Sequence, residues 1–82
     1  MHVDRVFSMK GYGTVVTGTV NSGRLKIGDT IEILPGSVRA RVRGLQSHSH
    51  EVETVSMGDR AAINLQGVEK SQIERGSQIP KP

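Results

Sequence analysis

The segment Thr14 to Val20 constrains the fold more than any other part of the chain. Six of its seven residues are β-branched, and the seventh is Gly18. β-branched side chains favour strands over helices. Glycine-containing turns flank the segment at residues 10–13 and 21–23, where positive φ angles are accessible. The sequence therefore predicts a strand bounded by turns, in which Gly18 marks a bulge or a close approach of another backbone.

Turn signals recur about every ten residues along the rest of the chain. The other expected strands are residues 3–9, 24–27, 30–34, 38–42, 60–65 and 78–79. Residues 46–59 are expected to be an irregular connection, and residues 67–76 a loop. This spacing is typical of an all-β domain, either a small barrel or a sandwich. With 82 residues the chain forms one domain at most.

Composition excludes several classes of function. The chain has no cysteine, which removes disulfides, thiolate metal sites and cysteine nucleophiles. No apolar run approaches the ~18–20 residues of a membrane span, so no membrane partner is expected. His48 and His50 could share a strand face, but two imidazoles do not complete a metal site. No Ser-His-Asp motif is present either, and we expect neither a catalytic residue nor a metal ligand.

The glycines at the first turn do not form a phosphate-binding loop. Gly11 and Gly13 would need a third glycine at position 16 for the dinucleotide fingerprint, and Val16 stands there. Gly13 and Gly18 have Walker-loop spacing, but Thr19 and Val20 replace its Lys-Ser/Thr pair. No nucleotide cofactor is expected in this chain, and these glycines are interpreted as turn or bulge residues.

Basic residues gather in the first part of the chain, which carries seven Lys or Arg against three Asp or Glu in residues 1–50. Arg39, Arg41 and Arg43 alternate with apolar residues, so they project from one strand face about 6.6–6.8 Å apart. That distance is close to the phosphate spacing of a nucleic acid strand. The row could therefore contact phosphates, or it could be a solvated face that prevents aggregation. Arg5 and Phe7 share another face, which is either a small pocket or a core edge.

At residues 4–20, the run Asp-Arg-Val-Phe-Ser-Met-Lys-Gly-Tyr-Gly-Thr-Val-Val-Thr-Gly-Thr-Val resembles the opening of domain 2 of translational GTPases of the elongation factor Tu superfamily. The resemblance continues through residues 23–29, 58–65 and 73–76, and it covers about residues 3 to 80. Asp4-Arg5 followed by Phe7, the Arg41–Arg43 strand, Gln46 and residues 60–65 are similar to the selenocysteine-specific elongation factors of this superfamily. Elongation factor Tu itself has acidic residues where Arg5 and Gln46 stand.

This resemblance implies a small closed antiparallel or Greek-key β-barrel of about six or more strands. Residues 1–82 would be one domain of a larger cytoplasmic GTPase, with Met1 and His2 as an addition to the natural domain. GTP and Mg²⁺ would bind a separate GTPase domain. The implied partners are selenocysteyl-tRNA, the ribosome, and the GTPase and third domains of the same protein.

The resemblance also implies roles for individual residues. Asp4, Arg5 and Arg43 would bind the aminoacyl group. Arg5 and Arg43 would contact the selenol, which is an anion at neutral pH whereas serine is not, and Asp4 would orient an arginine or contact the aminoacyl amine. The remaining implied contacts are Phe7, Gln46 and Arg60 with the tRNA 3′ end, and Arg39 and Arg41 with phosphates. In a regular strand Asp4 and Arg5 would project to opposite faces, so a shared pocket requires a bulge or a frayed strand end.

Two alternatives remain open at this stage. The chain could be domain 2 of another translational GTPase, of the elongation factor Tu or initiation factor type. It could also be a scaffold that transmits the GTP state between its neighbours and binds no tRNA itself.

Overall fold

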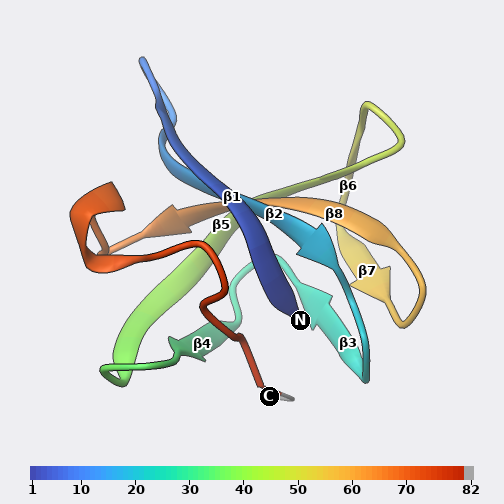
Figure 1. Cartoon of the computed structure of the whole chain (residues 1–82). Helices are drawn as coiled ribbons and strands as arrows, with labels where there is room; N and C mark the ends of the chain where they lie inside the picture. Colours follow the sequence, from blue (N-terminus) through green and yellow to red (C-terminus); the bar gives the residue numbers. More distant parts are fainter. Residues whose placement is uncertain (81–82) are drawn as a thin grey trace.

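The computed structural model describes residues 1–80 and contains eight strands and one short 3₁₀ helix within them (Figure 1). The elements are β1 (His2–Met9), β2 (Gly13–Thr19), β3 (Arg24–Lys26), β4 (Thr30–Ile33), β5 (Val38–Ser47), β6 (His50–Val52), β7 (Thr54–Ser56), β8 (Arg60–Gln66) and η1 (Lys70–Gln72). A six-stranded antiparallel sheet has the order β1-β2-β8-β5-β4, with β6 also paired to β5. Strands β3 and β7 form a second, two-stranded sheet. The all-β class is confirmed.

The sheet is not closed into a barrel. Strands β1 and β4 are the ends of the strand order, and Gln78 meets each side only through an isolated bridge, to His2 and to Leu34. Gln78 and Leu34 exchange two backbone hydrogen bonds of 2.8 Å. A longer ladder does not form there because a glycine turn at Gly76 precedes the segment and Pro80, which has no backbone N–H, follows it. The predicted closing strand is thus reduced to a bridging segment.

The core lies between the two sheets and follows the alternation of the strands. In β8 the inward residues Ala61, Ile63 and Leu65 are buried, whereas their neighbours are half-buried or exposed. The core cluster comprises Met1, Val3, Val16, Val20, Leu25, Ile31, Ile33, Ala40, Val42, Leu45, Val55, Ala61, Ile63, Leu65, Val68, Ile73 and Ile79. Val15 is also buried but lies outside this cluster, because alternate residues of a strand face opposite sides of the sheet.

The prediction of an irregular connection over residues 46–59 is wrong. Strand β5 continues to Ser47, and β6 and β7 follow within the same stretch. A bulge between Val42 and Gly44 shifts the alternation by one residue, so Leu45 faces the core again. The β5–β6 hairpin turns at His48 and Ser49, which have φ angles of 53° and 65°. Residues other than glycine rarely adopt such angles, so the sequence carries no clear turn signal there.

Gly18 is a point of close backbone approach, as the sequence predicts. A Cβ atom at this position would lie 2.1 Å from the carbonyl oxygen of His2. The bulge occurs on the neighbouring strand β1, where the register passes from Val3 opposite Gly18 to Arg5 opposite Thr17. Asp4 is the additional residue in β1, and its position decides the geometry of the candidate site.

Candidate functional site

The outer face of the large sheet, opposite the core, is built from two rows of cross-strand neighbours. One row is Arg5, Thr17, Ala62 and Gln46, and the other is Phe7, Val15, Asn64 and Gly44. Each row crosses β1, β2, β8 and β5 in that order. Thr17, Ala62, Val15 and Asn64 occupy the middle of the rows on β2 and β8. Arg5, Phe7 and Gln46 at the margins have longer side chains, so the floor between them is shallow.

A cavity of about 350 Å³ lies on this outer face, and we call it the outer-face cavity. It is lined by Phe7, Met9, Gly11, Tyr12, Val15, Arg43, Gly44, Leu45, Gln46, Glu51, Ala62 and Asn64. Three residues singled out from the sequence, Phe7, Arg43 and Gln46, meet here. Val15 and Asn64 were not among the residues selected from the sequence, although their alternation with the core residues Val16 and Ile63 was a usable signal.

Arg5 and Arg43 start from distant strands, and Phe7 is close to the first and shares a cavity with the second. Strands β1 and β5 are three strand spacings apart in the sheet, or about 14 Å along it. The guanidinium carbon of Arg5 nevertheless lies 5.6 Å from the centroid of the Phe7 ring, and Phe7 and Arg43 line the same cavity. A cation over an aromatic face is a favourable arrangement. Phe7 therefore links the surroundings of two arginines from different strands.

Asp4 is held by side chains from two neighbouring strands. Its Oδ1 accepts hydrogen bonds from Thr17 Oγ1 at 2.7 Å and from Arg60 Nη2 at 2.9 Å. Its Oδ2 accepts a short hydrogen bond from Arg60 Nη1. The bulge in β1 allows Asp4 to reach these partners while Asp4 and Arg5 line one cavity. In a regular strand these two adjacent side chains would project to opposite faces and could not share a cavity.

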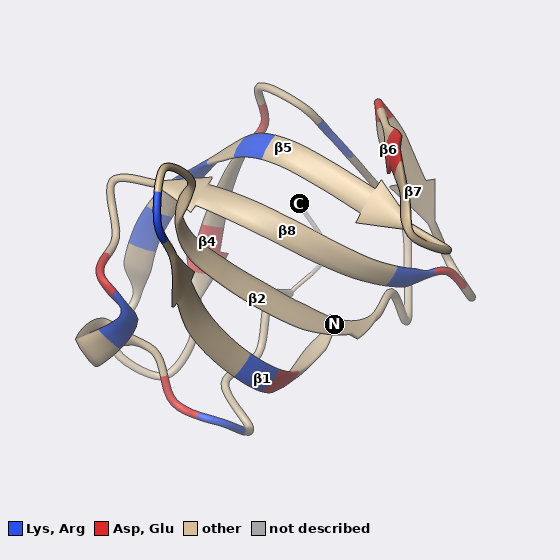
Figure 2. Cartoon of the chain, turned by 90° about the horizontal axis from the view of Figure 1, so that it is seen from above, with Lys and Arg blue, Asp and Glu red and all other residues tan. Residues whose placement is uncertain are grey.

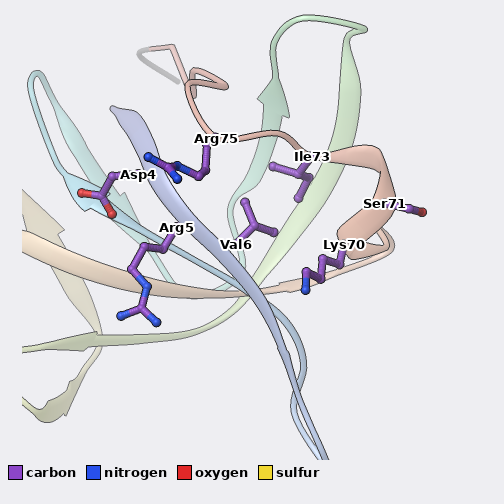
Figure 3. Close-up of a pocket in the computed structure, with 7 residues that line it drawn as sticks. All are labelled: Asp4, Arg5, Val6, Lys70, Ser71, Ile73 and Arg75. Carbon is purple, nitrogen blue, oxygen red and sulfur yellow. The ribbon is translucent and has the colours of Figure 1, made fainter.

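A second cavity, of about 900 Å³, lies between β1 and the segment around η1, and we call it the η1 cavity (Figure 3). Its lining residues are Asp4, Arg5, Val6, Lys70, Ser71, Ile73 and Arg75. Three of them are cationic. Lys70 and Arg75 were not among the residues selected from the sequence, because the expected loop at residues 67–76 gave no strand alternation to orient them.

Arg39 and Arg41 lie on the exposed side of β5, away from both cavities. Arg39 pairs across the sheet with Glu32 on β4, whereas Arg41 lies between Thr30 and Gln66. Figure 2 shows basic segments along β5, in the first half of β1 and at the start of β8. The glutamate opposite Arg39 offsets its charge, so Arg41 presents the less compensated positive charge of the two.

The part of the chain that the structure describes contains no cluster of three His, Asp or Glu side chains suited to a metal ion. Within residues 1–80 there is also no helix long and apolar enough to cross a membrane.

The contacts of Asp4 predict an acid titration. Hydrogen bonds from Arg60 and then Thr17 lower its pKa from 3.8 to about 2. Since the folded-state pKa is depressed, the stabilisation is complete above about pH 4 and is lost as the pH falls through about 2. We expect a carboxyl ¹³C resonance of Asp4 with a midpoint near pH 2, moving toward 3.8 in Arg60→Ala. Arg24→Ala, on β3, is the control that leaves it unchanged. An unchanged midpoint in Arg60→Ala would contradict the assigned cause.

Comparison with known proteins agrees with this geometry. The family model for elongation factor Tu domain 2 matches residues 13–79. The selenocysteine-specific elongation factor of Desulfomicrobium baculatum is 52% identical over 80 residues, which are 98% of this chain and 13% of that protein. The elongation factor 1-alpha of Pyrobaculum aerophilum is 37% identical over 82 residues, covering 100% of this chain and 18% of that protein.

Solved structures give the same result. Translation elongation factor SelB from Methanococcus maripaludis, in its apo form, superposes with a TM-score of 0.94 at 40% identity, covering 100% of this chain and 18% of that one. A bacterial selenocysteine-specific elongation factor gives a TM-score of 0.90 at 41% identity, over 99% of this chain and 14% of that one. The resemblance inferred from the sequence is confirmed. The chain belongs to the elongation factor Tu domain 2 family, as a domain 2 of the kind found in selenocysteine-specific elongation factors.

Proposed function

We propose that this domain binds the aminoacylated 3′ end of selenocysteyl-tRNA and performs no catalysis itself. The observation that carries the proposal is the position of Phe7, whose ring centroid lies 5.6 Å from the guanidinium carbon of Arg5 and which lines one cavity together with Arg43. An aromatic ring with one arginine beside it and a second arginine in the same cavity suits a ligand that combines an anion with a planar base. The selenolate of selenocysteine and the terminal nucleotide of tRNA together form such a ligand.

The residues of the site are proposed to contact different parts of the ligand. Phe7 and Gln46 contact the terminal nucleotide, the ring by stacking and the amide by hydrogen bonding. Arg5 and Arg43 contact the selenolate. Asp4 receives the aminoacyl ammonium or orients an arginine, and its bidentate contact with Arg60 supports the second role. Arg60 in turn borders the ester region.

The η1 cavity extends the same surface toward the tRNA backbone. Lys70 and Arg75 add two cations to Arg5 within it, and cations of this kind bind phosphate oxygens without reading sequence. Arg39 and Arg41 on β5 are proposed as further phosphate contacts, with Arg41 the stronger because no acidic residue lies directly opposite it.

The chain spans between about an eighth and a fifth of the length of the relatives it matches. The activity of a whole protein containing this domain is therefore part of the proposal. That protein would be a cytoplasmic GTPase that binds GTP and Mg²⁺ in its own GTPase domain. Within that protein, the GTPase domain and the third domain would contact this domain. The whole protein would deliver selenocysteyl-tRNA to the ribosome.

A second candidate is a general aminoacyl-tRNA domain, as in elongation factor Tu or an initiation factor. The similarity to elongation factor 1-alpha from an archaeon supports it. The two candidates differ in ligand selectivity, because a general domain has no need to distinguish a selenolate from a neutral hydroxyl.

The test is an amide chemical-shift titration of the labelled domain with short CCA-end mimics carrying either selenocysteine or serine. We expect shifts around Arg5, Arg43 and Arg60 with the selenolate mimic, and much smaller ones with the serine mimic. Equal shifts with both would favour the general domain. No shifts up to millimolar ligand would contradict autonomous binding by this domain and favour the scaffold alternative.

A further inference from the structure

Asp4 and Arg5 are adjacent and oppositely charged, yet each has a different partner. The Asp4 carboxylate accepts hydrogen bonds from Thr17 and Arg60, whereas the guanidinium of Arg5 lies over Phe7. We infer that Arg60 is a positioning residue, which occupies the Asp4 carboxylate and so keeps Arg5 un-neutralised and available to an anion. The inference deepens the proposed function, since it rests on Arg5 as the anion-binding residue.

The geometry of the pair suits this role. Thr19 lies between His2 and Arg60 across the sheet, so Arg60 must reach over β2 to contact Asp4 on the bulge of β1. Three of about four acceptor positions of the carboxylate are then filled, one by Thr17 and two by the guanidinium fork. Such bidentate contacts fix orientation as well as distance. The bulge and the fork together hold the carboxylate on the side of β2 and Arg60.

The electrostatic consequence concerns the η1 cavity, which both Asp4 and Arg5 line. The charge of Arg5 contributes to lowering the pKa of Asp4, after the hydrogen bonds from Arg60 and Thr17, so the two groups lie within each other's field. Without Arg60 the carboxylate would be compensated by Arg5, or by Lys70 or Arg75 from the same cavity. In each case the cavity would lose one positive charge. With Arg60 in place, all three cations stay available to an anionic ligand.

A charge-matched set of variants tests this inference with inorganic phosphate as the probe, at low ionic strength. Binding is measured as the shift of the Arg5 Nε–Hε resonance with phosphate concentration, in the 82-residue domain. Arg60→Ala is expected to weaken phosphate binding at Arg5 about two- to fivefold, the range for exposed charge pairs. The double variant Asp4→Asn/Arg60→Ala has the original net charge and is expected to restore binding. Arg24→Ala removes the same charge on β3 and is expected to leave binding nearly unchanged.

The outcomes distinguish a positioning role of Arg60 from direct contact of Arg60 with the anion and from an effect of net charge alone. If the double variant stays as weak as Arg60→Ala, Arg60 contacts the anion directly and the inference fails. If Arg60→Ala and Arg24→Ala weaken binding equally, only net charge matters and it also fails. Amide spectra confirm that each variant is folded before titration, and Arg60→Lys, which keeps the charge but not the fork, is the substitute if Arg60→Ala unfolds. The proposed function fails separately, if selenolate and serine mimics bind alike while the phosphate series behaves as expected.

Discussion

The double variant Arg5→Ala/Arg43→Ala is expected to abolish detectable binding of a selenolate-bearing CCA-end mimic. Each arginine is proposed to make a charge-assisted contact with the selenolate, and truncation of one such contact costs about 1.5–3 kcal/mol. That corresponds to about ten- to hundredfold in affinity. Because both arginines are proposed to contact the same ligand, the loss for the pair is about a hundredfold or more. Chemical-shift titration of single and double variants measures it.

The matched control is Arg24→Ala/Lys26→Ala, which removes the same charge from β3 outside both cavities. Its expected effect is below about threefold, since exposed charges far from the ligand are screened. The serine mimic gives a second control, because it offers no anion to either arginine. Equal losses for the two mimics would show that the arginines hold the nucleotide. No loss in the double variant would leave the scaffold alternative as the explanation.

Alternation of side chains and glycine turns were sufficient to predict the fold class and most strands. The core residues Val16, Ile63 and Val42 occupy the inward positions that the pattern indicates. The open sheet and the β5–β6–β7 region were not predictable in the same way. The sheet stays open because the segment between Gly76 and Pro80 forms only isolated bridges. The course of β5 to β7 depends on a bulge at Val42 to Gly44 and on positive φ angles at His48 and Ser49, and no glycine stands at that hairpin turn.

Candidate site residues could be selected from the sequence, but their contacts could not be predicted. Phe7, Arg43 and Gln46, selected by the resemblance, line one cavity, and their binding roles stay predictions. The contact of Asp4 with Arg60 joins residues 56 apart in sequence, and local periodicity carries no information on such a pairing. Lys70 and Arg75 were missed for a related reason, because their positions follow from the path of the chain around η1. Long-range packing therefore decides which charges are compensated and which are free.

Gly18→Ala is expected to destabilise the domain by about 3 kcal/mol or more. The new Cβ would lie 2.1 Å from the His2 carbonyl oxygen and 3.0 Å from the Met1 side chain. Neither backbone can yield without breaking the β1–β2 pairing, and overpacking of this kind costs about 1–3 kcal/mol, or more where backbone must move. A domain of this size has roughly 4–12 kcal/mol of total stability. Urea denaturation would therefore show a large fall in the unfolding midpoint.

Gly44→Ala is the matched control for Gly18→Ala. Its Cβ would lie 3.7 Å from the Cβ of Asn64, an ordinary van der Waals distance, and its φ angle is not positive. We expect a change within about 0.5–1 kcal/mol, because replacing glycine by alanine in an accessible conformation costs little and can even stabilise. The Gly18 variant should also displace the adjacent bulge, so the Asp4 carboxyl pKa should rise from about 2 toward 3.8. Equal stability of the two variants would mean that the close approach at Gly18 does not hold β1 in place. The geometry of Asp4 and Arg5 would then have to be maintained by the contacts of Asp4 with Arg60 and Thr17.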